Sequence, residues 1–180
     1  MKAFPLLSKC AVAAFTAIGA LSAIPAFADT TWNWHYSGDS INASGTFTAS
    51  DAVDALGFHS ITAITGSRNG DAITGLYPTG SAIPGNEPYA LDNLIRVGGQ
   101  GQITVHGFGF AMASGGYANP YFADFLTPPA YSEVFTTSSS FSEVPITFSA
   151  APVPEPETIM LVLVGLGTLG VAARLRRRAA

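Results

Sequence analysis

Alternation of apolar and polar residues at period two recurs along the central part of this chain, and no stretch keeps a helical period. Successive side chains of a β-strand point to opposite faces of the sheet, so this alternation predicts strands with one buried face. Turn-rich segments separate these stretches. Many short strands without intervening helices predict an all-β sandwich or barrel, and we expect an antiparallel β-sandwich of about eight to nine short strands.

The clearest local signal is Asn69-Gly70, because both residues accept the positive φ of a two-residue hairpin turn. The flanking segments 61–66 and 72–76 are similar in sequence, and we expect them to be the paired arms of one hairpin. The alternative, a solenoid repeat, lacks further copies at a fixed period. The expected strands are Thr31–Ser37, Gly45–Ser50, His59–Gly66, Asp71–Tyr77, Asp92–Val97, Gln102–Ala111, Tyr121–Leu126, Tyr131–Thr136 and Pro145–Ser149.

The N-terminal residues have the three parts of a secretory signal peptide in order. Lys2 and Lys9 are the positive residues, an apolar run covers residues 11–23, and Ala26-Phe27-Ala28 is the small-x-small pattern that signal peptidase accepts. We therefore expect cleavage after Ala28, with Asp29 as the first residue of the mature chain.

An uncharged apolar run from Ile159 to Ala173 is followed at once by an arginine cluster. At about 1.5 Å per helical residue the run spans roughly 23 Å, which is short of the ~30 Å hydrocarbon core. Positive charge stays on the cytoplasmic side, so we expect the arginines inside and the body outside. The cluster consists of Arg174, Arg176, Arg177 and Arg178.

The residues directly before this run are Val153-Pro154-Glu155-Pro156-Glu157-Thr158. Together with the apolar run and the arginine cluster, they resemble the PEP-CTERM sorting signal of Gram-negative bacteria, in which these three parts follow one another. The resemblance implies recognition by a membrane-embedded exosortase and passage of the body to the envelope or extracellular matrix. The alternative is a plain anchor behind a proline-rich stalk, which predicts the same topology without cleavage. The expected sorting motif is Val153, Pro154, Glu155, Pro156, Glu157 and Thr158.

The body has a strand-like segment at Ser44–Ser50, a hairpin-like segment at Ile64–Leu76, and the segment Asp92–Ile95 followed by Gly107–Phe110. In these features it resembles exported proteins that bear the same tail, and the resemblance implies a single β domain without implying an activity. The expected organisation is a signal peptide at 1–28, a β-sandwich domain at 29–151, a Pro-Glu-Pro linker at 152–158, a transmembrane helix at 159–173 and a basic cytoplasmic tail at 174–180.

The charge of the body excludes one class of partner. Residues 29–157 contain all 12 acidic side chains of the chain and two basic ones, Arg68 and Arg96, which gives a formal charge of −10. Nucleic-acid binding needs a basic face, so no nucleic acid is expected. The one cysteine, Cys10, lies in the signal peptide, so disulfides, thiol catalysis and cysteine metal sites are excluded from the mature chain.

The histidines and tryptophans are the first candidates for a site. His35, His59 and His106 lack HxH or HExxH spacing, so a zinc site would need ligands from distant segments. His59 and His106 lie in expected strands, where a hydrogen-bonded sheet histidine is the more common explanation. Trp32 and Trp34 could stack on a sugar, but the alternation favours both on the core face, opposite Asn33 and His35.

The other candidates carry oxygen ligands or nucleophiles. Asp51 and Asp54, with Asp71 elsewhere, could cleave glycosides at a separation of roughly 5–10 Å, or could end a strand and open a turn. Ser114 precedes two glycines but lacks the first glycine of a nucleophile elbow, so a glycine loop is expected. Asn69 and Asp71 offer calcium only a weak site, because no DxDxDG loop is present. No catalytic residue, metal ligand or cofactor is expected.

These observations predict a non-enzymatic exported protein, first anchored in the inner membrane with a periplasmic body and then sorted to the envelope or extracellular matrix. Signal peptidase and exosortase are the expected processing partners, the membrane contacts the C-terminal helix, and exopolysaccharide is a further candidate partner. The alternative is a carbohydrate-binding or carbohydrate-active secreted protein that uses Trp32, Trp34 and nearby acids.

Overall fold

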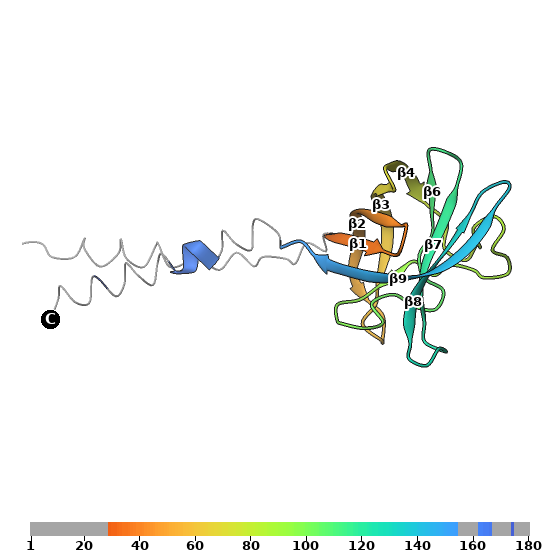
Figure 1. Ribbon diagram of the computed structural model, residues 1–180. Coiled ribbons are helices and arrows are strands. Elements are labelled where there is room, and N and C mark those ends of the chain that lie inside the picture. Colours follow the sequence, from red (N-terminus) through yellow and green to blue (C-terminus); the bar gives the residue numbers. More distant parts are fainter. Residues whose placement is uncertain (1–28, 155–161, 167–173, 175–180) are drawn as a thin grey trace, which may run out of the picture.

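The computed structural model describes residues 29–154, 162–166 and 174 (Figure 1). Nine strands lie in the first range. They are β1 (Thr30–Ser37), β2 (Asn42–Val53), β3 (His59–Arg68), β4 (Asp71–Leu76), β5 (Leu94–Ile95), β6 (Phe110–Met112), β7 (Tyr117–Ala123), β8 (Ala130–Thr136) and β9 (Phe141–Pro152).

The strands form one antiparallel sheet that closes on itself. Neighbours follow the order β2-β1-β9-β8-β7-β6-β4-β3, and β3 pairs with β2 to complete an eight-stranded barrel. β5 is an additional strand that pairs with His59 and Ser60 at the start of β3. The all-β antiparallel prediction is confirmed, but the expected sandwich is not, because pairing between β2 and β3 joins the two ends of the sheet.

Two strands change partners along their length, and this bends the sheet around its core. Residues 141–146 of β9 pair with β8, and residues 147–152 pair with β1. On the other side, Asp71 and Ala72 of β4 pair with β3, whereas residues 73–76 pair with β6. β9 therefore crosses from one group of strands to the other, as Figure 1 shows. Strands shared in this way make the corners of an all-β domain.

Alternate side chains of β1 fill the interior of the barrel. Trp32, Trp34 and Tyr36 are buried, and the residues between them are exposed. The Trp34 ring stacks on Phe47 of β2 with 5.4 Å between centroids, and Phe47 meets Phe108 edge-on at 4.9 Å. The predicted core face of β1 is therefore confirmed, and it carries the largest rings of the core.

The predicted Asn69-Gly70 turn is confirmed, with φ of 51° and 84°. The pairing of its arms is shorter than expected, because only Ser67 with Ala72 and Arg68 with Asp71 are paired. The expectation that segments 61–66 and 72–76 pair with each other is wrong. The first segment pairs with β2 and most of the second pairs with β6, which is how the sheet extends into a barrel.

The strand prediction also fails between residues 102 and 109, which form an irregular segment that leads into the short β6. At the start of this segment, the Gln102 side chain accepts from the N–H of Ala150 at 3.0 Å and donates to the Ala150 carbonyl at 2.7 Å. Gly107 has φ of +63°, and a Cβ there would lie 2.0 Å from the carbonyl oxygen of Pro120. β7 begins at Tyr117 and ends at Ala123, earlier than expected at both ends.

Both ends of the described barrel lie on neighbouring strands. Trp32 of β1 pairs with Pro152 of β9, and the N–H of Val153 donates to the carbonyl of Thr31 at 2.7 Å. The expected signal peptide lies outside the described residues. Of the expected span, residues 162–166 are described and are helical. Among the described residues, no helix has the length and apolar character needed to cross a membrane.

Candidate functional site

The outer face of β7, β8 and β9 carries the candidate site. Strand pairing aligns its side chains in rows across the sheet, and Asn119, Val134 and Glu143 form one such row. The next row on one side contains Tyr121, and the next row on the other side contains Phe141. The opposite face of the same strands contributes to the core of the barrel.

The connection between β4 and β5, residues 77–93, covers part of this outer face and is called the cover below. Ile83 and Leu91 of that connection pack against Val134 of β8 as a second, smaller core. β8 is therefore buried on both faces, which explains why its sequence does not alternate. The cover ends beside β9, where Phe141 and Glu143 remain exposed.

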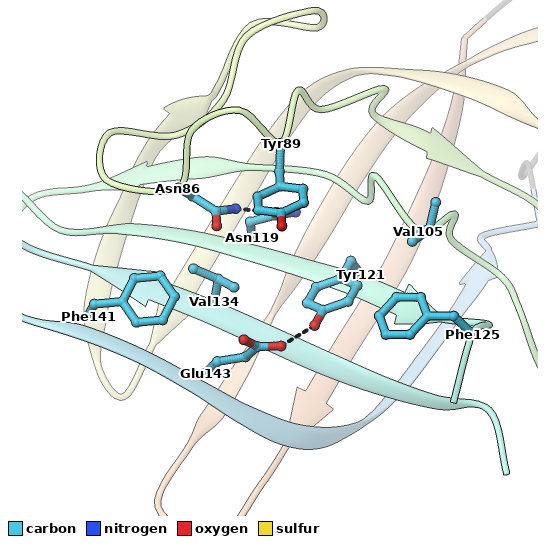
Figure 2. Close-up of a pocket in the computed structure, with 9 residues that line it drawn as sticks. All are labelled: Asn86, Tyr89, Val105, Asn119, Tyr121, Phe125, Val134, Phe141 and Glu143. Carbon is cyan, nitrogen blue, oxygen red and sulfur yellow. Dashed lines mark hydrogen bonds between the residues drawn. The ribbon is translucent and has the colours of Figure 1, made fainter. Parts of the chain in front are cut away.

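A pocket of about 380 Å³ lies between this cover and the three strands (Figure 2). Its aromatic side chains are Tyr89 from the cover, Tyr121 from β7, Phe125 from the turn after β7 and Phe141 from β9. Tyr89, Phe125 and Phe141 are 66%, 67% and 57% exposed. Exposed aromatic rings around a concave surface are typical of a binding site. The remaining lining residues are Asn86, Val105, Asn119, Val134 and Glu143.

Tyr121 and Glu143 form the polar centre of the pocket. The Tyr121 hydroxyl donates to one carboxylate oxygen of Glu143 across the sheet (Figure 2). Burial raises the pKa of Tyr121 to about 12, and the hydrogen bond and negative charge of Glu143 add to the shift. The tyrosine therefore stays protonated at neutral pH and keeps Glu143 in place, while the second carboxylate oxygen is left to accept a bond.

Two buried amides fasten the cover to β7 beside the pocket. Asn86 Nδ2 donates to Asn119 Oδ1 at 3.2 Å, and Asn119 Nδ2 donates to the carbonyls of His106 and Phe108, each at 3.1 Å. The fold thus uses the Asn119 amide as a donor and one N–H group of Asn86. The oxygen of Asn86 faces the pocket in Figure 2, so this side chain offers an acceptor there.

A second polar cluster lies inside the barrel. Arg68 of β3 donates to both carboxylate oxygens of Glu133 on β8, from Nε at 2.8 Å and from Nη2 at 2.7 Å. The hydroxyl of Tyr36 on β1 donates to the same carboxylate, which is fully buried. The guanidinium lies over the ring of Phe135, 4.0 Å from its centroid. The three groups satisfy one another, so we interpret the cluster as a structural link.

The electrostatics of this cluster fix its protonation state. Burial raises the pKa of Tyr36 well above its ordinary value, and the charge and hydrogen bond of Glu133 raise it further. Burial alone would lower the pKa of Arg68, but its hydrogen bond to Glu133 and the charge of that carboxylate outweigh burial and raise the pKa. Tyr36 stays neutral and Arg68 stays charged at neutral pH.

The candidate sugar-stacking surface is wrong for Trp32 and Trp34. They are 1% and 2% exposed, and their rings pack inside the barrel. Neither indole N–H has a hydrogen-bond partner among the described residues. The alternative function that relied on these two rings therefore loses its binding surface.

The three histidines lie in separate places. His59 Nδ1 lies 2.7 Å from the carbonyl oxygen of Ser50, which confirms the prediction of a sheet histidine. His106 is not in a strand as expected, and its Nδ1 lies 2.9 Å from the Ala90 carbonyl. His35 is exposed on β1. In the described part of the chain, no three His, Cys, Asp or Glu side chains are grouped so as to hold a metal ion.

The candidate carboxylates have local structural partners. Asp51 accepts from the hydroxyl of Thr30 at 2.6 Å, and Asp54 accepts from the N–H groups of Leu56 and Phe58 at 2.8 and 2.9 Å. The expectation that this segment ends a strand and opens a turn is therefore confirmed. Asp71 instead starts β4, after the Asn69-Gly70 turn. There it accepts a 3.4 Å bond from the N–H of Ser114, which lies in the tight turn between β6 and β7.

Part of the expected sorting tail is described. Val153 is held by its bond to Thr31, and Pro154 and Arg174 are exposed. Asp29, the expected first residue after cleavage, lies one residue before β1 and is exposed. The expected site residues that lie outside the described residues are Ala26, Ala28, Glu155, Pro156, Glu157, Thr158, Arg176, Arg177 and Arg178.

Sequence reasoning missed the pocket. Phe141 and Glu143 lie two apart and so share one face of β9, and this was the available signal. Their neighbours in the pocket come from β7, β8 and the cover, and only the register of the barrel brings these together.

Comparison with known proteins identifies the tail. A family model described as the PEP-CTERM protein-sorting motif matches residues 152–178. No curated protein and no solved structure matches the chain. The match begins at Pro152, the last residue of β9, so the motif follows the barrel without a spacer. The chain therefore carries a PEP-CTERM protein-sorting motif and is an exported protein that is sorted by an exosortase.

Proposed function

We propose that the barrel is a non-enzymatic module of the cell envelope or extracellular matrix, delivered there by its C-terminal sorting signal. The observation that carries this proposal is the sorting motif at residues 152–178, joined directly to the last strand of the barrel. A body with a formal charge of −10 and no lysine repels its own copies and stays soluble after release.

The route of delivery follows from the two ends of the chain. The expected signal peptide starts export, and the arginines after Ala173 keep the C-terminus in the cytoplasm. The barrel then lies on the periplasmic side of the inner membrane until the exosortase acts. Because the two ends of the barrel are on neighbouring strands, both processing events take place on the same side of the domain.

The non-enzymatic role is supported by what the candidate catalytic groups do in the fold. Asp51 and Asp54 bind nearby backbone or hydroxyl groups, His59 lies against a strand carbonyl, and Glu133 is sealed inside the barrel. None of these groups lines the pocket on the outer face of β7, β8 and β9. Function then depends on binding or assembly.

Mass spectrometry of both termini, on protein purified from its native host, tests this proposal. We expect an N-terminus at Asp29 and a C-terminus between Glu155 and Thr158, with the protein in the envelope or matrix fraction. Substitution of Glu155→Ala should leave the full tail and keep the protein in the inner membrane. A conservative change in the apolar run, Leu166→Ile, is the control. An intact C-terminus on the wild-type protein would contradict sorting to the matrix and would indicate a permanent anchor.

A further inference from the structure

Three aromatic rings of the pocket on the outer face of β7, β8 and β9 lie outside the packed cores of the protein. Tyr89, Phe125 and Phe141 each leave more than half of their surface in water. Exposure of several large rings around one concave surface is uncommon in a soluble protein unless that surface binds something. The shape and the hydrogen-bonding groups of the pocket define what it can bind.

The aromatic groups are spread along the strands, which favours an extended ligand. Phe141 lies in one cross-strand row and Tyr121 lies two rows away, with Glu143 in the row between them. Two rows correspond to four residues of strand, or about 13 Å. A small ion or a single amine cannot contact both rings at once, whereas a chain of several ring-shaped units can.

The polar groups inside the pocket mainly accept hydrogen bonds. One oxygen of Glu143 and the oxygen of Asn86 are left to accept, while the Tyr121 hydroxyl and one of the two Asn86 side-chain N–H groups already donate within the protein. The Tyr89 hydroxyl is exposed and can do either. A ligand that fits must therefore donate hydrogen bonds, as sugar hydroxyls do, and must present apolar faces to the rings, as pyranose C–H faces do.

The charge of the pocket and of the body narrows the class of ligand further. None of the nine lining residues is basic, and Glu143 contributes a carboxylate. The body around the pocket has a formal charge of −10. Uronic-acid and phosphate-bearing chains are repelled by this field. We propose that the pocket binds a neutral glycan chain, with Tyr121, Phe125 and Phe141 against the sugar rings and Glu143 and Asn86 as acceptors for sugar hydroxyls.

This proposal goes beyond the sorting function and does not depend on it. The binding test uses the full chain with the tail in place. The protein is purified in a polyoxyethylene ether detergent, because a sugar-based detergent would compete. It is screened on an array of neutral oligosaccharides built from glucose, galactose, mannose and xylose, and hits are measured by isothermal titration. An oligogalacturonate, choline and an extended apolar peptide are the competing probes.

We expect saturable binding of at least one neutral chain, with the hexasaccharide bound more tightly than the monosaccharide. Phe141→Ala should weaken binding about two- to tenfold because it removes one stacking face. Glu143→Gln should weaken it about threefold or more, because a charged acceptor makes the stronger hydrogen bond. The matched control is Leu56→Ala, which also removes an exposed apolar side chain but lies in a turn that does not line the pocket.

Several results would overturn the proposal. They are binding of no neutral chain on the array, equal effects of Phe141→Ala and Leu56→Ala, and preference for the oligogalacturonate, choline or the peptide. Each variant is first checked for an unchanged unfolding midpoint, which we expect because both substituted apolar side chains are exposed. A failure of this test leaves tail processing unaffected, and a failure of tail processing leaves this binding measurement unaffected.

Discussion

One carboxylate, Glu133, links three strands that are not neighbours in the barrel. It lies on β8 and accepts bonds from Arg68 of β3 and Tyr36 of β1. In the order of the sheet, β8 adjoins neither β1 nor β3, so these bonds cross the interior. Backbone pairing fixes each strand against its neighbours, and this cluster adds a constraint between opposite walls. A buried ion pair of this kind costs desolvation, so its main effect is expected when one partner is missing.

We expect Glu133→Gln to lower the free energy of unfolding by about 3–5 kcal/mol, because Arg68 then keeps a buried charge without a counter-ion. Arg68→Met combined with Glu133→Gln removes both charges and leaves an amide acceptor for Tyr36, so much of the stability should return. Urea unfolding, followed by tryptophan fluorescence, measures both variants. Equal midpoints for the single and the double variant would contradict this account.

At the scale of elements, β2 and β3 approach each other closely where two glycines are paired. Gly45 and Gly66 face each other in the register. A Cβ on Gly45 would lie 1.9 Å from the carbonyl oxygen of Thr65, and a Cβ on Gly66 would lie 2.2 Å from that of Ser44. Backbone atoms cannot move aside as a flexible side chain can. The pairing that closes the barrel therefore requires glycine at both positions.

Gly45→Ala should destabilise the protein by about 2 kcal/mol or more, because the new methyl group forces β2 away from β3. Gly75→Ala is the matched control: Gly75 also lies within a strand, β4, but a Cβ there meets no atom within 4 Å. We expect the control to change stability by less than about 1 kcal/mol. Thermal unfolding of both variants by circular dichroism makes the comparison, and similar melting temperatures would refute the close-contact argument.

The elements that the sequence predicts well are those with one buried face. β1 was expected nearly in full, because its alternation reflects a core on one side and water on the other. β3 was also expected nearly in full, although its buried residues are not strictly alternate. Apolar and polar residues do not alternate along β8, because the cover buries its outer face as well. The segment 102–109 was assigned wrongly as a strand, because isolated backbone bonds join it to β7, such as that from the Phe108 N–H to the Pro120 carbonyl, in place of a continuous ladder.

The candidate site was harder to predict than the strands. Its row of Asn119, Val134 and Glu143 depends on the register of three strands, and register is set by closure of the whole barrel. Barrel closure itself requires that β9 and β4 each pair with two strands along their length, and local sequence patterns do not reveal this. The tail was predictable because its chemistry is contiguous in sequence, and the family match confirms it.

At the scale of the whole molecule, the sorting motif and the barrel share a boundary. Val153 is the last residue with a described backbone bond to the barrel, and Pro154 is exposed. Cleavage after Glu155 would therefore remove none of the described strands and none of the described bonds of the barrel. A domain that is complete at residue 153 can be released without refolding.

We expect a chain that ends at Glu155 to unfold at the same urea concentration as the full chain, because all nine strands are present. A chain that ends at Ile146 should lose cooperative unfolding, since it lacks the residues of β9 that pair with β1 and the Ala150 backbone that binds Gln102. Hydrogen exchange of β1 amides gives a second readout. Cooperative unfolding of the shorter chain would show that β9 is not needed for closure.

The position of β9 also sets the order of events while the chain is made and translocated. The first described strand pairs with the last, so β1 lacks one of its two partner strands until residue 152 has emerged on the far side of the membrane. At that moment the residues that still lie in the translocation channel are those of the sorting signal. Completion of the barrel and arrival of the signal at the membrane are therefore nearly simultaneous, and an enzyme that reads the signal meets a chain that has only just become able to fold.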